Sequence, residues 1–333
     1  DRYIIGVLYR VLSQVFYNYI APNCYSYKTK TNTSDAIKDI SKTDFLFSYG
    51  LKLDIQAYFN SVNRDHLNKC LTELFGEDTG IRKTLDGLYN NDRVLYRGKE
   101  IEEYKGLIPG CALGSFFANY CLREIDYYFL EKGITYARYS DDIIYFANSK
   151  EELDITLEYL KAMLAKYKLE INENKYVYFE PGEMVEYLGL KLDEKGIDVS
   201  THAKKKMKRL IKRWVRKARM EIEIDGRDFE KVAKRLISRF NYRIYKCFIE
   251  DARKFGWAFY AFRYITVTDS LIEIDYYFKD RLRYLKTGKN NKANIKALSN
   301  EEIDELGWVS MYEMYRLFKE DFDYYCEVVS LLK

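Results

Sequence analysis

The sequence predicts an α+β fold, with an antiparallel sheet in the first two thirds of the chain and helices toward the C-terminus. Aromatic and β-branched residues flank Asp141 and Asp142 on both sides, which predicts a hairpin over 137–146 with the acids at its turn. A second apolar run, 49–54, predicts a short strand that ends at Asp54. Later in the chain, apolar side chains recur mainly at helical spacing.

The composition permits a large core but gives the chain little overall charge. A chain of 333 residues is long enough for two or three linked subdomains, and its formal net charge is only +4. The charge is unevenly distributed, because ten Lys or Arg residues and no acid lie between Lys204 and Arg219, whereas 301–327 is strongly acidic. Such asymmetry predicts a local electrostatic footprint for a nucleic acid.

The cysteines and histidines give no sign of a metal or nucleophilic site. No Cys-x-x-Cys pair and no clustered histidines accompany the cysteines, which stand at 24, 70, 111, 121, 247 and 326. We therefore expect buried or free thiols in a reducing cytosol and no structural zinc. His66 and His202 are expected to be surface or packing residues, which argues against a Ser-His-Asp or His-metal hydrolase. No apolar run reaches bilayer length, and we expect no secretory signal.

Three carboxylates at two strand ends suggest a metal site. Paired aspartates in a turn are usually solvated turn formers, so Asp141 and Asp142 alone carry little weight. Asp54 adds a third acid at a second strand end. Together they suit two divalent cations about 3.5–4 Å apart, which activate one oxygen and stabilise the leaving oxygen in phosphoryl transfer. Because neighbouring side chains of a strand point opposite ways, Asp142 can support the metals indirectly. We therefore expect its replacement to reduce activity less than replacement of Asp54 or Asp141 does.

The Tyr-Ser-Asp-Asp hairpin at 139–142 and the Leu-Asp-x-x-x-x-Phe strand at 53–59 resemble the two catalytic motifs of reverse transcriptases, and five further stretches match in order. The resemblance covers about residues 1–200 and continues more loosely beyond them. It implies a right-hand polymerase with fingers, a palm of ferredoxin-like antiparallel sheet with helices, and an α-helical thumb. The implied divisions are fingers at 1–50, palm at 51–63, a fingers and palm insertion at 64–105, palm with primer-grip hairpin at 106–200, and thumb with C-terminal extension at 201–333.

The N-terminal region resembles the fingers. Helical spacing predicts a first helix, and the basic strand pair that precedes it in the family is absent, so we expect part of the fingers to lie before Asp1. Residues 25–37 resemble the finger motif Gly-Phe-Arg-Pro-Gly-Arg-Ser-x-x-Asp-Ala-Ile, with Lys28 at an Arg position and Lys30 two residues on. The resemblance implies that both lysines bind the incoming triphosphate, and the alternative is a solvated polar loop.

Phe59 takes the place of the family's steric gate. A large ring beneath the sugar leaves no room for a ribose 2′-hydroxyl, so the resemblance implies selection of deoxynucleotides. A core phenylalanine is the alternative, and the offset of Phe59 from Asp54 favours the gate. Residues 64–105 combine helical spacing with a strand pair around 93–96 and a turn at Gly98, and are expected to return to the fingers.

Residues 107–126 resemble the template- and nucleotide-contacting motif Gln-Gly-x-x-x-Ser-Pro-x-x-Ala-Asn-x-x-Leu. Gly110 and Asn119 match, whereas Pro109 replaces Gln and Gly114-Ser115 replaces Ser-Pro. Small residues let a backbone approach a base pair closely, so Gly110 is a candidate nucleotide contact. Similar departures occur in diversity-generating and "unknown group", often defence-associated, bacterial enzymes. They leave fidelity, template choice and even the need for a template open.

Two motifs complete the predicted palm. After a predicted helix over 151–168, residues 169–175 resemble the motif Leu-x-x-Asn-x-x-Lys. This implies that Lys175 protonates or neutralises the leaving pyrophosphate, and a surface lysine is the alternative. Residues 186–190 resemble the Phe-Leu-Gly primer-grip hairpin. The primer contacts implied there are Tyr187, Leu188 and Gly189.

Residues 204–215 predict a basic amphipathic helix. One stripe is apolar and the remaining surface is cationic, so the helix can pack by one face and offer the other to a phosphate backbone, as a polymerase thumb does. A calmodulin-target or membrane-surface helix has the same pattern, and the position after the primer-grip hairpin favours the thumb. The cations expected to contact the duplex are Lys205, Lys208, Lys212 and Arg216.

The resemblance implies RNA-templated addition of deoxynucleotides to a DNA or RNA primer, with a dedicated non-coding RNA as template. Two Mg²⁺ ions, for which Mn²⁺ can substitute, are expected at Asp54, Ile55, Asp141 and Asp142. A cytoplasmic bacterial retroelement or antiphage defence enzyme without a membrane partner is implied, and a homo-oligomer is left open. Two alternatives remain, a template-independent or protein-primed deoxynucleotidyl polymerase and a catalytically idle RNA-binding maturase-like protein. The three aspartates and Phe59 argue against the idle protein, which has no physical need to keep them.

Overall fold

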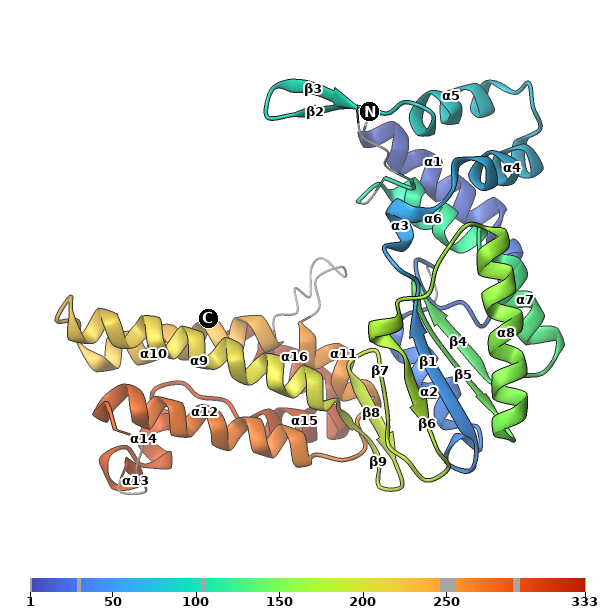
Figure 1. The fold of residues 1–333 in the computed structure, drawn as a ribbon. Coiled ribbons are helices and arrows are strands. Elements are labelled where there is room, and N and C mark those ends of the chain that lie inside the picture. The colour runs from blue at the N-terminus through green and yellow to red at the C-terminus, as the bar shows by residue number, and fades with distance from the viewer. Residues whose placement is uncertain are drawn as a thin grey trace. The chain divides into compact units, whose positions relative to one another are not determined.

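A computed structural model of the chain describes residues 2–28, 31–102, 106–108, 110–245, 256–289 and 294–332 (Figure 1). The chain divides into two compact units, Asp1–Glu183 and Met184–Lys333, and each is described by itself. The primer-grip hairpin expected at 186–190 lies in the second unit, together with the helices that follow it.

The first unit is built around a four-stranded antiparallel sheet in the order β4-β5-β1-β6. Along the chain, β1 is followed by helices, then the β4–β5 hairpin, one further helix and β6, which is the βαββαβ order of ferredoxin-like folds. The predicted antiparallel palm sheet, the strand ending at Asp54 and the hairpin with two acids at its turn are therefore confirmed. The strands are β1 (Tyr49–Asp54), β4 (Tyr136–Tyr139), β5 (Asp142–Ala147) and β6 (Val177–Phe179).

Two helices cover one face of this sheet. Helix α7 (Arg123–Glu131) packs on β4, and α8 (Lys150–Lys166) packs on β1 and β5 (Figure 1). Because successive side chains of a strand alternate between faces, β1 directs the buried Leu51 and Leu53 toward these helices. The same alternation directs Asp54 to the other face. One face of the sheet is thus committed to the core, and the opposite face carries the acid.

The rest of the first unit consists of short helices and one hairpin. Helix α1 packs on α6, α4 packs on α5, and α2 contacts β4. The predicted N-terminal helix and the predicted strand pair around Gly98 are confirmed. The elements are α1 (Arg2–Val15), α2 (Thr33–Ser41), α3 (Tyr58–Ser61), α4 (Arg64–Phe75), α5 (Gly80–Tyr89), β2 (Arg93–Tyr96), β3 (Lys99–Glu102) and α6 (Ala112–Tyr120), with 3₁₀ turns at Tyr17–Tyr19, Phe45–Phe47 and Glu173–Lys175.

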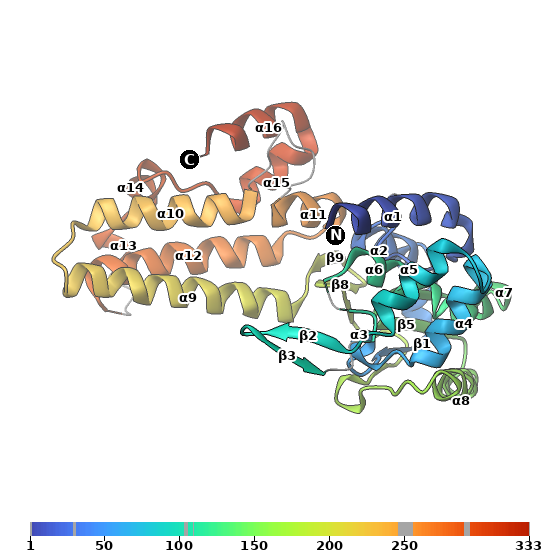
Figure 2. The same cartoon turned by 90° about the horizontal axis from the view of Figure 1, so that it is seen from above.

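The second unit joins a three-stranded antiparallel sheet to a set of helices. Helices α9, α10 and α12 lie side by side in both Figure 1 and Figure 2. The predicted basic helix is α9, which buries Ile211, Trp214 and Val215 against its neighbours. The elements are β7 (Val185–Tyr187), β8 (Leu190–Asp193), β9 (Gly196–Val199), α9 (Thr201–Glu223), α10 (Phe229–Tyr245), α11 (Trp257–Tyr264), α12 (Asp269–Thr287), α13 (Asn294–Ala297), α14 (Asn300–Glu305), α15 (Met311–Glu320) and α16 (Phe322–Leu331). Among the described residues, no helix combines the length and apolar character needed to cross a membrane.

Candidate active site

Strand pairing brings Asp54 and Asp142 together. The antiparallel register of β1 and β5 sets Asp54 directly opposite Asp142. Directly opposed residues of an antiparallel pair project from the same face, so both carboxyl groups lie on the face away from α7 and α8. Asp141 precedes β5 and lies in the turn, so strand alternation does not apply to it. The register therefore removes the reason for expecting a milder effect from the loss of Asp142.

Hydrogen bonds hold the turn that carries Asp141. Ser140 has a φ of 62°, which is costly for a residue with a side chain. Its N–H donates to Ser26 Oγ at 2.9 Å, and its carbonyl accepts from Arg138 Nη1 at 3.0 Å. The Ile55 N–H donates to the Asp141 carbonyl at 3.1 Å, which ties the turn to the end of β1. Since the Ile55 side chain has no ligand atom, this residue can serve a metal only through its backbone carbonyl.

A buried polar network stands behind the turn. Ser26 Oγ donates to Asn119 Oδ1 at 2.8 Å, and the Asn119 amide donates back to the Ser26 carbonyl at 2.6 Å. Arg138 is fully buried and donates from Nε and Nη2 to the two carboxylate oxygens of Asp126, at 2.7 and 2.5 Å. Breaking such a buried pair leaves an uncompensated charge, so the network is strongly constrained. The sequence motifs named Asn119 but not Ser26, Asp126 or Arg138 as a site residue. For Arg138, the available signal was an arginine inside an otherwise apolar predicted strand.

Two side chains from the segment before β6 contact Asp54. Lys175 Nζ donates to Asp54 Oδ2 at 2.8 Å, and Asn172 Nδ2 donates to Oδ1 at 3.3 Å. The hydrogen bond to Asp54 raises the pKa of Lys175, so the amine stays protonated. Lys175, which the sequence motif names, therefore lies beside Asp54 as a charged hydrogen-bond donor.

Burial raises the pKa of both acids at the hairpin turn. It raises the pKa of Asp142 to about 6, and the negative charges of Asp141 and Asp54 act in the same direction. The pKa of Asp141 is raised too, chiefly by burial and also by Asp54. A divalent cation relieves such crowding of carboxylates, and Mg²⁺ prefers oxygen ligands. The donor set therefore fits the magnesium site that the sequence predicts.

Phe59 lies in an aromatic group that is linked to the turn carrying Asp141. Its ring meets those of Tyr27 and Tyr58 edge to face, each with centroids 6.0 Å apart. The Tyr27 hydroxyl in turn donates to Ser140 Oγ at 3.3 Å. The Phe59 carbonyl accepts the Leu107 N–H at 2.8 Å, which fixes the backbone as well. These contacts link the half-buried ring, through Tyr27, to the turn that carries Asp141.

Lys28 and Gly110, which are predicted to contact the incoming nucleotide, lie among the described residues. Lys28 Nζ donates to the Ala21 carbonyl at 3.2 Å and lies 5.3 Å from the centroid of the Tyr17 ring. Burial lowers the pKa of Lys28, and its ammonium is engaged with the fold in this conformation. Lys30 lies outside the described residues. Gly110 has a φ of 86° in the turn before α6, a conformation that favours glycine.

The predicted primer-grip residues form a tight hairpin in the second unit. Leu188 and Gly189 connect β7 to β8 with φ values of 48° and 86°, as a two-residue type I′ turn requires. Tyr187 is buried, so its side chain serves the core of this unit. Within the hairpin, Leu188 and Gly189 are the more exposed of the three.

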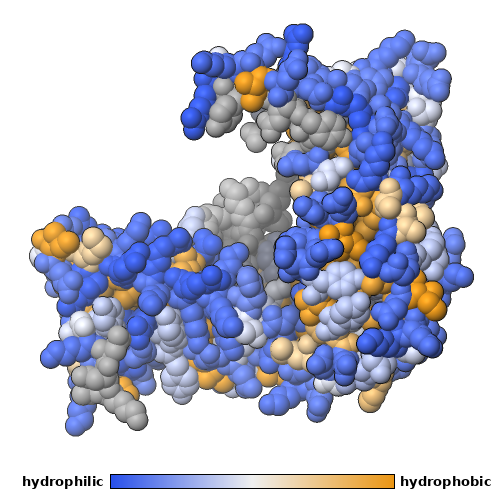
Figure 3. All heavy atoms as spheres, in the orientation of Figure 1, coloured by the Kyte–Doolittle hydropathy of each residue, from blue (hydrophilic) through white to orange (hydrophobic). Residues whose placement is uncertain are grey.

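The basic helix α9 borders a cationic groove. The groove has a volume of about 320 Å³, and its basic lining comes from α9 and α12: Arg209, Lys212, Arg213, Arg216 and Arg281. Lys205 is also exposed, whereas Lys208 is ion-paired with Glu273. The exposed side chains over α9 are mostly hydrophilic in Figure 3. Of the four cations expected to contact the duplex, Lys212 and Arg216 line this groove.

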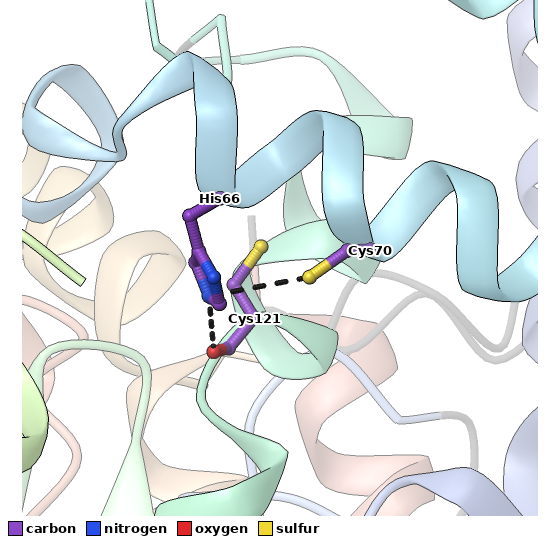
Figure 4. Close-up of side chains that lie close together, drawn as sticks. All are labelled: His66, Cys70 and Cys121. Carbon is purple, nitrogen blue, oxygen red and sulfur yellow. Dashed lines mark hydrogen bonds between the residues drawn. The ribbon is translucent and has the colours of Figure 1, made fainter. Parts of the chain in front are cut away.

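One grouping of cysteines and histidine was not predicted from the sequence. His66 packs on Tyr167, as expected of a packing residue, and the fold also brings it together with Cys70 and Cys121 (Figure 4). A hydrogen bond with Cys121 lowers the pKa of Cys70 against the opposing effect of burial, and His66 and Arg123 lower it further. The His-x-x-x-Cys spacing on a helix was the available signal, since it places both side chains on one face.

The family of the chain follows from its sequence match. The model of the family described as "Reverse transcriptase (RNA-dependent DNA polymerase)" matches residues 2–192, which is more than half of the chain. This protein belongs to the reverse transcriptase family, and its α+β fold is that of a right-hand polymerase.

The chain is also similar to individual proteins, over different shares of its length. It is 28% identical over 137 residues to the Retron Ec83 reverse transcriptase of Escherichia coli, a match that covers 39% of this chain and less than half, 43%, of that relative. Among solved structures, it is similar to telomerase from Candida albicans in complex with a TWJ fragment of telomeric RNA, with 14% identity, a TM-score of 0.47, and coverage of 98% of this chain and 58% of that one. It is also similar to the foamy viral protease-reverse transcriptase in complex with an RNA/DNA hybrid, with 15% identity, a TM-score of 0.34, and coverage of 73% and 28%.

Proposed function

We propose that this protein is an RNA-directed DNA polymerase that extends a primer by two-metal phosphoryl transfer. The register of β1 and β5 supports this most directly, because it sets Asp54 opposite Asp142 with Asp141 in the adjoining turn. In a member of the reverse transcriptase family, three acids at the strand ends of a ferredoxin-like sheet provide a physical basis for that reaction.

The residues divide the chemistry among them. Asp54, Asp141, Asp142 and the backbone carbonyl of Ile55 are the groups that would hold two Mg²⁺ ions. When bound, such ions activate the attacking 3′-hydroxyl and stabilise the leaving oxygen. Lys175, protonated and hydrogen-bonded to Asp54, donates its proton toward the leaving pyrophosphate.

Substrate selection is assigned to the nucleotide side of the site. Phe59 excludes the ribose 2′-hydroxyl, since its ring is held between Tyr27 and Tyr58 and has little freedom to move aside. Lys28 and Lys30 are assigned to the triphosphate, and Gly110 to close approach of the backbone. For Lys28 this role requires exchange of its bond to the Ala21 carbonyl.

The nucleic-acid partners are proposed to be an RNA template and a DNA or RNA primer. The cationic groove beside α9 supports a phosphate-binding surface in the second unit. The similarity to a retron reverse transcriptase of Escherichia coli supports a bacterial retroelement. We further propose that its template is a dedicated non-coding RNA and that it acts in antiphage defence. We place its action in the cytoplasm.

Two other functions are compatible with the same fold. A template-independent or protein-primed polymerase would use the same acids but make DNA without RNA. A maturase-like RNA-binding protein would use the fold only as a grip. The crowded acids with raised pKa values favour an enzyme, because a binding protein gains nothing from this electrostatic cost.

A primer-extension assay distinguishes the three functions. The purified chain is incubated with Mg²⁺, deoxynucleotides and a primed RNA of defined sequence, and the product is sequenced. We expect DNA complementary to the RNA and no product when the RNA is omitted. Product without RNA would indicate the template-independent polymerase, and RNA binding without any product would indicate the maturase-like protein. Sequencing the nucleic acid that co-purifies with the protein then identifies the natural template.

A further inference from the structure

A second cluster of metal-ligating side chains lies in the first unit, outside the aspartate site. His66 and Cys70 are one turn apart on α4, and Cys121 follows the last residue of α6 (Figure 4). One ligand atom from each residue lies within 4.8 Å of the other two. Both thiols are buried, with 1% of each residue exposed. In the part of the chain that the structure describes, no other three His, Cys, Asp or Glu side chains form such a group.

We propose that His66, Cys70 and Cys121 form a binding site for a soft divalent transition metal, namely Zn²⁺. Two thiolates and one imidazole are the ligands that Zn²⁺ prefers, and they leave a fourth tetrahedral position open. With Zn–S bonds of about 2.3 Å, tetrahedral geometry puts two sulfur atoms about 3.8 Å apart. The ligand atoms therefore have to move together by no more than about an ångström, which side-chain rotation provides.

The surroundings of the cluster suit a metal with two thiolate ligands. Two thiolates and one Zn²⁺ have no net charge, so the buried site is not left with an uncompensated ion. Arg123 Nη1 lies 4.0 Å from Cys70 Sγ, within reach of a weak N–H···S hydrogen bond that would support the thiolate. The His66 ring stacks on Tyr167 with centroids 4.1 Å apart, which fixes its plane. His66 Nε2 lies 2.9 Å from the Cys121 carbonyl and 4.0 Å from Cys70 Sγ, so metal binding exchanges the first contact for a metal bond.

A water molecule is the expected fourth ligand. A cavity of about 200 Å³ adjoins the cluster and is lined by His66 and Cys70 as well as by Glu73 and Glu124. Both carboxylates already have partners, because Glu73 pairs with Arg123 at 2.5 Å and Glu124 accepts from the Tyr167 hydroxyl at 2.5 Å. The cavity is large enough for water and provides the entry path that a metal needs.

The site would join two elements that are distant in the chain. His66 and Cys121 are 55 residues apart, so one metal would hold α4 against the end of α6. Cys121 follows Asn119 by two residues, and Asn119 supports the catalytic turn through Ser26. Metal binding is therefore expected to stabilise the first unit, because only the folded chain brings the three ligands together.

Cobalt titration tests the site without relying on catalysis. The full chain is purified with reductant, freed of metal, and titrated with Co²⁺ in excess Mg²⁺. We expect one Co²⁺ per chain, with the intense visible bands of tetrahedral cobalt and a thiolate-to-cobalt charge-transfer band. Zn²⁺ should abolish the visible bands and the charge-transfer band by displacing Co²⁺, and it should raise the melting temperature of the protein. C70S and C121S should lose the charge-transfer band and H66N should weaken cobalt binding, whereas the control C326S should behave as the parent.

A second measurement uses only the parent and therefore does not depend on folding of the variants. Zn²⁺ should protect Cys70 and Cys121 from a thiol alkylating reagent, as read by peptide mass, and leave Cys326 reactive. Absence of a charge-transfer band in the parent, or alkylation of Cys70 and Cys121 that is as complete with Zn²⁺ as without it, would overturn the proposal. A Cys70–Cys121 disulfide in place of cobalt binding would also overturn it and identify a redox pair. None of these results depends on whether the protein is a polymerase.

Discussion

Asp142 combines two properties that oppose each other, burial and negative charge beside two other acids. Its pKa rises from 3.8 to about 6 in the folded chain. The folded state therefore holds this proton more tightly than the unfolded state does, and stability falls as pH rises from about 4 to about 6. Above that window the cost is fully present until a cation binds.

Asp142→Asn should consequently stabilise the metal-free protein while removing activity. At pH 7 we expect the free energy of unfolding in urea to rise by about 1–2 kcal/mol, a value reduced for partial exposure of the carboxyl. Below about pH 4 the variant and the parent should be equally stable. Asp78→Asn is the control, because the Asp78 side chain is 97% exposed. Equal stability of Asp142→Asn and parent at pH 7 would contradict the electrostatic account.

Phe59 is the proposed steric gate that excludes the 2′-hydroxyl of a ribonucleotide. Phe59→Ala removes the group that would collide with a 2′-hydroxyl, so incorporation of ATP relative to dATP should rise by at least about tenfold. Single-nucleotide extension with each triphosphate measures this ratio. Phe47→Ala is a matched control, because Phe47 is 81% exposed and has no place at the site. A parent that already uses both nucleotides equally would refute the gate.

At the scale of elements, the turn that carries Asp141 depends on segments far apart in the chain. Ser26 precedes α2, Asn119 lies on α6, and both support the turn between β4 and β5. The strained φ of Ser140 persists because Ser26 Oγ accepts from its N–H and Arg138 Nη1 donates to its carbonyl. The position of Asp141 is therefore a property of three elements together.

Ser26→Ala should disturb the turn without touching an acid. It removes the hydroxyl that accepts the Ser140 N–H and donates to Asn119 Oδ1, so we expect the free energy of unfolding to fall by about 1–3 kcal/mol. The extension rate should also fall, with little change in RNA affinity. Ser41→Ala at an exposed position should change stability by less than about 0.5 kcal/mol. If Ser26→Ala and Ser41→Ala gave the same stability, the supporting network would have no energetic role.

The cationic groove can be separated from the rest of α9 by its partners. Lys212→Gln with Arg216→Gln removes two groove cations and keeps the buried stripe of α9, so the fold should survive. The slope of log affinity for RNA against log salt should flatten by roughly 0.7–0.9 for each phosphate that the variant no longer neutralises. Lys208→Gln is the matched control with a smaller expected change, because Lys208 is paired with Glu273. An unchanged slope in the double variant would show that the groove is only solvated.

Local patterns predicted the elements better than the contacts between them. Alternation and helical spacing indicated β1, the β4–β5 hairpin, α8 and α9, because these signals lie within each segment. The register of Asp54 against Asp142 depends on pairing of distant strands, and no local pattern contains it. The proximity of His66 to Cys121 also joins distant segments, so alternation and helical spacing within one segment cannot predict it. Long-range pairing therefore decided both the position of Asp142 opposite Asp54 and the grouping of His66 with the two cysteines.

At the scale of the whole molecule, the two compact units carry different features of the proposed polymerase. The acids and Lys175 belong to Asp1–Glu183, whereas the basic helix and the cationic groove belong to Met184–Lys333. Chemistry and phosphate binding should accordingly respond to separate substitutions. This separation makes it possible to remove the reaction while RNA binding is monitored independently.

Primer extension by Asp54→Ala and Asp141→Ala tests the central claim most directly. Each change removes a proposed metal ligand, so extension on primed RNA with Mg²⁺ should fall by more than about a hundredfold. RNA affinity, measured on the same preparations, should stay close to that of the parent because the groove cations are unchanged. Extension within about tenfold of the parent in either variant, a barrier change of only about 1.4 kcal/mol, would contradict the assignment of these aspartates as the catalytic metal ligands.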